Sequence, residues 1–162
     1  MKKTNSPRTN VLRLLDAAGI GYSVKEYPVD ESDLSALHAA EFLDIPPGRI
    51  FKTLVLRGAG GACFVCCVPA TDELDLRKAA RAAGEKSAAL VPVKDIKPLT
   101  GYVRGGCSPV GMKKQFPTFI DETAGLFDSI AVSAGERGLQ ILLAPGDLAR
   151  YIGARFADLT DN

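Results

Sequence analysis

The chain is poor in the residues that supply acid–base and metal chemistry. Its 162 residues include one histidine, His38, and no tryptophan. A histidine-rich zinc site needs several imidazoles, and a Ser-His-Asp triad would use the single histidine. This inventory excludes most histidine-based mechanisms, and we expect neither a metal nor a cofactor.

The chain also lacks an excess of charge. Lysine and arginine number 20 against 19 acidic residues, so the formal net charge is +1. Such a protein has no overall field that attracts nucleic acid indiscriminately. Any RNA contact must come from a local patch, and we expect no DNA partner.

No long apolar segment is present either. Residues 1–10 are basic and polar, and no apolar run of about 18 residues follows them. We therefore predict a cytoplasmic protein that does not bind membranes. Disulfides are rare in that compartment, so the four cysteines are expected to be thiols.

The cysteines are placed unfavourably for chemistry. Cys63-x-x-Cys66 lies in a predicted strand with no second pair of cysteines or histidines, which favours buried structural thiols. Cys107 lies in a glycine-rich loop, where we expect more exposure. A cysteine nucleophile needs a nearby base, and His38 belongs to a separate predicted helix, so Cys107 is interpreted as a spectator thiol.

The remaining composition, 46% hydrophobic and 24% charged, is that of one soluble globular domain. In the predicted helix 32–43, Leu34, Leu37 and Phe42 are expected to face the core. Asn10 is predicted to cap the first helix. The other predicted helices cover 11–18, 72 or 75 to 83, and 146–152, and 93–99 forms a helical turn at best. The predicted strands cover 22–27, 50–57, 62–69, 88–91, 116–121, 129–132 and 139–143. This order predicts an α+β fold, a mixed sheet or small irregular barrel with flanking helices.

Two features can carry chemistry. Lys52 lies inside an apolar strand, where a cation at the wall of a partly desolvated cleft would bind phosphate or a developing oxyanion. The alternative is a lysine that protects a sheet edge. The loop 101–111 holds four glycines and either wraps a ligand or forms a structural turn. Basic residues near the glycine turns either form a phosphate-binding rim or are solvated surface charge; they are Arg104, Lys113, Lys114 and Arg137.

Several segments together resemble one family. The segments are Phe51–Val55, Leu74–Lys78, Thr100–Lys114, Arg137–Ile141 and Pro145–Leu148. In order and spacing they are similar to the YbaK-type aminoacyl-tRNA deacylases, free-standing relatives of the editing domain of bacterial prolyl-tRNA synthetase. The resemblance extends from about Thr9 to Leu159.

The resemblance implies a single α+β editing domain over residues 1–162, with its core at about 9–159 and an irregular mixed β-barrel. It implies removal of cysteine from mischarged Cys-tRNA(Pro), with Cys-tRNA(Cys) as a second substrate, at the acceptor end of the tRNA. Prolyl-tRNA synthetase is the implied partner, and we expect the protein itself to be a monomer.

The resemblance also implies a mechanism and a site. The thiol of the attached cysteine attacks its own ester carbonyl and leaves as a thiolactone. Lys52 matches the critical lysine of the family, and Gly105 to Pro109 match its Gly-x-x-x-Pro loop, which makes Lys52, Gly105 and Pro109 the implied catalytic positions. The implied substrate-binding positions are Tyr27, Thr53, Gly106, Cys107, Ser108 and Ser133. Gln140 stands where some members carry an aspartate, so no catalytic role is assigned to it.

Two alternatives remain at this point. The first is hydrolysis of another small misacylated residue, such as the alanine of Ala-tRNA(Pro). The second is a non-catalytic module that binds the tRNA end, in which Lys52 and the loop would recognise phosphate alone.

Overall fold

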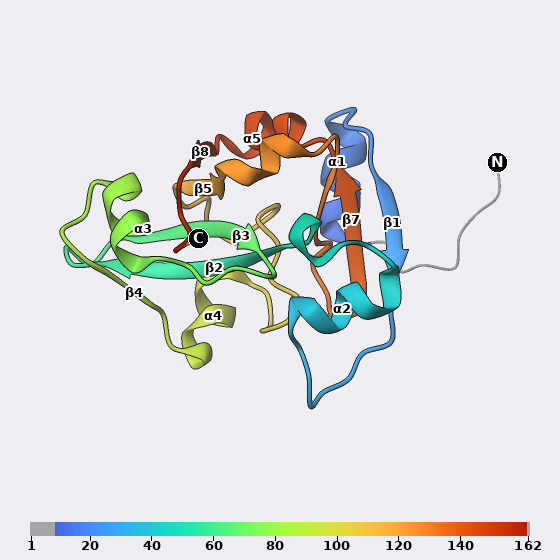
Figure 1. Cartoon of the computed structure of the whole chain (residues 1–162), viewed down its shortest axis with the longest axis horizontal. Coiled ribbons are helices and arrows are strands. Elements are labelled where there is room, and N and C mark those ends of the chain that lie inside the picture. The colour runs from blue at the N-terminus through green and yellow to red at the C-terminus, as the bar shows by residue number, and fades with distance from the viewer. Residues whose placement is uncertain (1–8, 162) are drawn as a thin grey trace.

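The computed structural model describes residues 9–161, so most of the polar segment 1–10 lies outside the described residues. Two sheets and five α-helices make up an α+β fold, which confirms the predicted class (Figure 1). The helices are α1 (Asn10–Ala17), α2 (Ala36–Leu43), α3 (Leu76–Ala83), α4 (Val93–Thr100) and α5 (Pro145–Ile152). The strands are β1 (Ser23–Glu26), β2 (Phe51–Gly58), β3 (Cys63–Pro69), β4 (Ala88–Leu90), β5 (Thr118–Asp121), β6 (Ile130–Ser133), β7 (Leu139–Leu143) and β8 (Arg155–Ala157).

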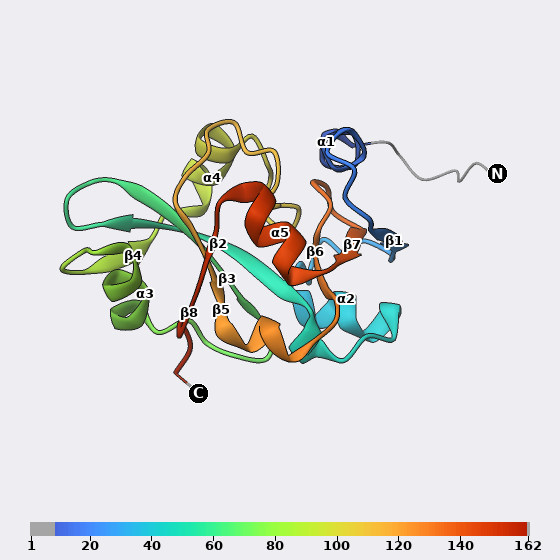
Figure 2. The same ribbon diagram turned by 90° about the horizontal axis from the view of Figure 1, so that it is seen from above.

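The strands pair in two sheets. The smaller sheet has the order β1-β7-β6 and is antiparallel throughout. The larger has the order β4-β2-β3-β5-β8, in which β5 joins β3 and β8 in parallel. A single parallel bridge between Ile50 and Ala131 connects the two sheets. Figure 2 shows the long β2–β3 hairpin of the larger sheet running across the molecule toward β6 and α2.

Strand β2 is paired unevenly along its two edges. Its ladder with β3 runs from Phe51 to Arg57, whereas its ladder with β4 covers only Leu56 to Gly58. On the β4 side the chain continues with one bond, from the Val91 N–H to the Val55 carbonyl. The segment 52–54 therefore has a regular partner on one side alone, although β2 is an inner strand of the sheet.

Three predictions about helices are wrong in detail. Thr9, rather than Asn10, caps α1, because its hydroxyl accepts from the Leu12 N–H. Helix α2 begins after the Ser35 cap and buries Ala39, Ala40 and Leu43, while Leu37 and Phe42 are half exposed. The α4 segment forms eight helical residues, and Pro98 is tolerated near its C-terminal end.

Three clusters of buried side chains fill the fold. The largest joins α1, α5 and one face of β2, β3 and β5 to β6 and β7. A second packs α2 against Ile50 and Ala131, and a third packs α3 against the opposite face of the larger sheet. Within residues 9–161, no helix has the length and apolar character to cross a membrane.

Asp121 fastens the C-terminal segment to the larger sheet. Its side chain is 1% exposed, accepts from the Leu159 N–H at 2.9 Å and accepts from the amide and hydroxyl of Thr123. We expect Asp121→Ala to lower the free energy of unfolding in urea by roughly 2 kcal/mol, because buried donors lose their acceptor. The exposed Asp128→Ala control should change it by less than about 0.5 kcal/mol; equal losses would contradict this role.

Candidate active site

A cavity of about 500 Å³ opens at the incompletely paired edge of β2. Its walls come from the segment before α2, from β2, from the β4–α4 junction, from the glycine loop and from β6 and β7. Of the residues predicted from sequence for the site, it brings together Tyr27, Lys52, Thr53, Gly105, Cys107 and Ser133. Segments separated by more than a hundred residues thus meet at one edge.

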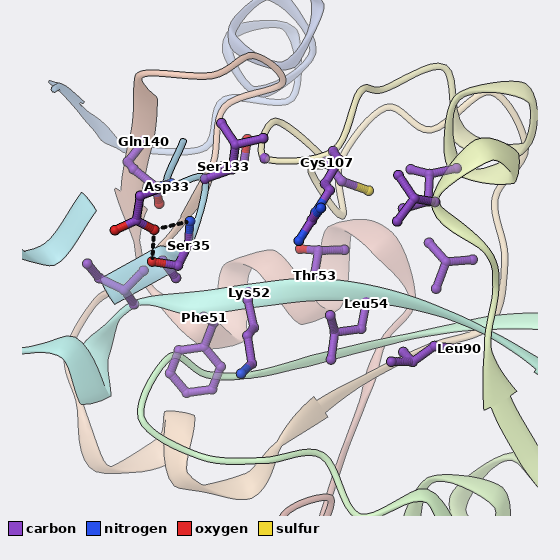
Figure 3. Close-up of a pocket in the computed structure, with 18 of the residues that line it drawn as sticks. Asp33, Ser35, Phe51, Lys52, Thr53, Leu54, Leu90, Cys107, Ser133 and Gln140 are labelled. Atoms are coloured by element: carbon purple, nitrogen blue, oxygen red, sulfur yellow. Dashed lines mark hydrogen bonds between the residues drawn. The ribbon is translucent and has the colours of Figure 1, made fainter. Parts of the chain in front are cut away.

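Lys52 and Thr53 project to opposite sides of β2. Side chains alternate along a strand, and Figure 3 shows Thr53 directed toward Cys107 and Ser133, while Lys52 points away from them. Both residues line the cavity, because it extends around the open strand edge. Thr53 therefore places a hydroxyl on one side of the strand edge and Lys52 a cation on the other, and the cavity is lined by two further charged residues, Asp33 and Arg104.

The glycine loop approaches the cavity through Gly105. This residue has φ +87°, a conformation that favours glycine, and an added Cβ would lie 3.2 Å from the Leu34 Cβ. The Gly106 N–H donates to the Val103 carbonyl, so this amide is used inside the loop. Gly106, Ser108 and Pro109 are buried and are not among the residues that line the cavity.

Cys107 is buried, at 9% exposure, so the predicted exposure of this thiol is wrong. The loop folds inward and packs Cys107 into the main core beside the cavity. Burial raises the pKa of Cys107 to about 11, partly offset by a hydrogen bond with Thr100. The thiol is therefore protonated at neutral pH, as the spectator interpretation requires.

Ser133 and Gln140 form a directly opposed pair on β6 and β7, so their side chains share one face. Both line the cavity, and they are 8% and 6% exposed. The Ser133 hydroxyl accepts from the Gly135 N–H at 3.2 Å. The Gln140 Oε1 has no hydrogen-bond partner within the described part of the chain. A buried acceptor without a donor is costly, and this atom lies in the wall of the cavity, within reach of whatever occupies it.

Asp33 is a cavity residue that sequence reasoning missed. Its carboxylate accepts from the amide and hydroxyl of Ser35, the cap of α2, and these bonds lower the pKa of Asp33. The Asp-x-Ser pattern before a helix is the local signal that could have found it. Leu34, Leu90 and Val93 complete an apolar rim that hydrophobic periodicity alone does not reveal.

The other titratable candidates lie elsewhere. His38 Nε2 contacts the Pro28 carbonyl at 3.1 Å, and its ring lies 4.9 Å from that of Phe42. It does not line this cavity. Cys66 and Cys67 are buried in the sheet, and burial raises the pKa of both thiols. Among residues 9–161, no cluster of His, Cys, Asp and Glu side chains is arranged to hold a metal ion.

Comparison with known sequences decides the family. The family model for the aminoacyl-tRNA editing domain matches residues 31–151, which span most of the cavity walls. The chain belongs to the aminoacyl-tRNA editing family. An Enterococcus faecalis protein named "Putative Cys-tRNA(Pro)/Cys-tRNA(Cys) deacylase EbsC" is 45% identical over 159 residues, which are 98% of this chain and 97% of that protein. The Bacillus subtilis protein YwhH is 25% identical over 75% of this chain and 77% of its own.

Solved structures agree with this family assignment. A crystal structure described as a "putative trans-editing enzyme for prolyl tRNA synthetase" matches with a TM-score of 0.82 and 28% identity, covering 97% of this chain and 100% of that one. The structure of a hypothetical protein, 21% identical, matches with a TM-score of 0.84 over 93% of this chain and 99% of its own, which shows the shared fold.

The buried Cys107 should resist alkylation. At pH 8 a thiol with a pKa of about 11 is ionised in roughly one molecule per thousand. We expect iodoacetamide to label the partly exposed Cys63 first, and Cys107 labelling to accelerate as pH rises toward 11, because the thiolate fraction grows. Peptide mass spectrometry measures both sites. Labelling of Cys107 at pH 8 as fast as that of an exposed thiol would contradict the buried, protonated state.

Proposed function

We propose that this protein deacylates Cys-tRNA, with Cys-tRNA(Pro) as its main substrate and Cys-tRNA(Cys) as a second one, acting on tRNA released by prolyl-tRNA synthetase. The substrate's own thiol is the nucleophile. Its sulfur bonds to the ester carbonyl carbon, the bond from that carbon to the ribose oxygen breaks, and the thiol proton passes to the ribose oxygen. The products are the thiolactone of cysteine and free tRNA.

The chemistry of the cavity wall is the observation that carries this proposal. Among the described residues that line it, none is a histidine, and the carboxyl is that of Asp33, whose pKa is lowered by Ser35. A carboxylate with a lowered pKa is a weak general base. The thiol of Cys107 has a raised pKa and is a poor nucleophile. A described cavity wall with neither a strong base to activate water nor an activated nucleophile suits a substrate that supplies its own nucleophile.

The two sides of β2 suit the two parts of the substrate. On one side of the strand edge, Thr53, Cys107 and Ser133 offer short neutral side chains, beside which a cysteinyl side chain would lie, while Asp33 and Arg104 line the same cavity. Lys52, on the other side of the strand edge, would bind the ribose or phosphate of the tRNA end. An ester that crosses the edge would then lie beside the backbone of β2 and Gly105. Holding thiol and carbonyl in this geometry can supply several kcal/mol of the barrier.

Gln140 adds a neutral acceptor to the cavity wall. Its Oε1 would accept a hydrogen bond from the ammonium or thiol of the substrate, which removes the cost of leaving it unpartnered. An aspartate at this position would hold a thiol or an ammonium by charge. The Gln140 amide can accept a hydrogen bond at the same place but carries no charge. Binding through Gln140 therefore does not depend on the protonation state of this side chain.

The thiol mechanism can be tested with matched esters. We expect Cys-tRNA(Pro) to be deacylated with release of thiolactone, whereas S-methylcysteinyl-tRNA(Pro) and Ala-tRNA(Pro) persist, because they lack a free thiol. Release of radiolabelled amino acid measures the rates. Unchanged cleavage of the S-methyl ester would overturn substrate assistance, and preferential cleavage of Ala-tRNA(Pro) would favour hydrolytic editing.

Lys52 should be needed for turnover. We expect Lys52→Ala to lower kcat/KM for Cys-tRNA(Pro) by about 100-fold or more, because the cation that holds the substrate end is removed. The exposed Lys86→Ala has the same change of charge away from the cavity and should retain wild-type kcat/KM. Circular dichroism checks folding. Equal activity of the two variants would remove Lys52 from the site.

A further inference from the structure

Positive charge is concentrated in one segment beside the cavity. Residues 93–114 contain five basic residues and one acid, whereas the rest of the chain has 15 basic residues and 18 acids. This segment comprises α4 and the glycine loop, which lie together beside the β2–β3 hairpin in Figure 2. The near-neutral net charge of the protein thus conceals a local basic surface.

Helix α4 places part of this charge next to the cavity mouth. Val93 and Ile96 line the cavity, and Val93 is 57% exposed at its rim. Lys97 lies four residues after Val93 and three residues after Lys94, and residues at these spacings are neighbours on a helix surface. Lys94 and Lys97 therefore lie side by side next to Val93. Lys113 joins them, because its Nζ donates to the Pro98 carbonyl at 3.5 Å. We call Lys94, Lys97 and Lys113 the basic ridge.

The ridge is not neutralised by the protein itself. Among the residues that the structure describes, no carboxylate forms an ion pair with these three lysines, and Lys94 and Lys97 are exposed. The one acid of this segment is Asp95. It lies one residue after Lys94 and two before Lys97, spacings at which side chains on a helix do not face each other. The ridge therefore presents uncompensated charge to solvent.

The other side of the cavity mouth has the opposite charge. Asp30, Glu31 and Asp33 fall in the four-residue stretch 30–33 ahead of α2, and Asp33 lines the cavity. Hydrogen bonds from Ser32 lower the pKa of Asp30, and those from Ser35 lower the pKa of Asp33, so both remain ionised at neutral pH. Glu31 is paired with Arg137 at 3.6 Å, so Asp30 and Asp33 are the acids that repel a polyanion at the α2 side, whereas the ridge attracts it at the α4 side.

Between the cavity and the ridge lies an apolar step. Leu90 and Val93 are 53% and 57% exposed, and both line the cavity. A surface of this kind fits the face of a nucleobase better than a phosphate. From the cavity outward, the surface changes from Lys52 to the apolar rim and then to the basic ridge. In a single RNA strand the same order is the terminal ribose, its base and the preceding phosphates.

We infer that the unpaired 3′ strand of the tRNA leaves the cavity over Leu90 and Val93 and lays its phosphates on the basic ridge. This inference rests on the proposed function, because it takes an aminoacyl-tRNA as the ligand. It assigns a direction to the RNA, along α4 and away from α2. The contacts are to the backbone, so they add affinity without sequence preference.

Salt dependence tests the ridge directly. The variant Lys94→Gln/Lys97→Gln removes two exposed charges at the ridge, and Arg77→Gln/Arg81→Gln removes two exposed charges from α3 on another face. For Cys-tRNA(Pro), we expect the ridge variant to raise KM about tenfold and to reduce the slope of log KM against log salt by about 1.4, or roughly 0.7 for each lysine–phosphate pair that the substitutions remove. The α3 control should stay within about twofold of wild type.

Each result bears on one proposal. An unchanged KM and slope in the ridge variant, or equal changes in the α3 control, would overturn the ridge. If wild-type protein leaves every aminoacyl ester intact, the proposed function fails. The ridge is then tested by the slope of log Kd against log salt for uncharged tRNA, measured by fluorescence anisotropy. Circular dichroism and Tm confirm folding, and the single Lys94→Gln variant provides the same readout, with an expected change in slope of about 0.7.

Discussion

The uneven pairing of β2 is the constraint on which the site depends. Its pairing on the β4 side ends with the bond from Val91 to Val55, and the bridge to β6 occurs at Ile50, so the edge at residues 52–54 faces the cavity. A fully paired β2 would close the cavity and hide Lys52 and Thr53 behind another strand. An unpaired strand edge is usually a liability. Here the cavity walls from α2, α4 and the glycine loop surround it, so another chain cannot pair with it easily.

The scarcity of reactive groups gives the cavity its chemical character. Enzymes that activate water need a base held at a suitable pKa, and this cavity moves its titratable groups in the unhelpful direction, the pKa of the carboxyl down and that of the thiol up. What the wall does supply is shape, the cations Lys52 and Arg104, and the unpartnered Oε1 of Gln140. Such groups bind and orient a ligand, and this is the role that the proposed mechanism asks of this member of the aminoacyl-tRNA editing family.

Much of the fold could be predicted from sequence, because periodicity and turn residues act locally. The β2–β3 hairpin and the Asp75-capped α3 follow from such signals. The buried face of α2 could not be predicted, since its alanines fit against Ile50 only when the two sheets have come together. The same holds for the burial of Cys107, which depends on contacts of the glycine loop with segments distant in sequence. For Asp33, the Asp-x-Ser pattern indicates the turn before α2 but not the position of that turn at the cavity.

Gly106 has a consequence for how the cavity meets its ligand. A Cβ at this position would lie 3.0 Å from backbone atoms of Glu136 and Arg137, and the Arg137 Nε also donates to the Arg104 carbonyl. The glycine loop and the β6–β7 turn therefore approach each other closely at Gly106, and a side chain at this position would force their backbones apart. The outline of the cavity at Gly105 thus depends on a neighbouring residue that does not itself line the cavity.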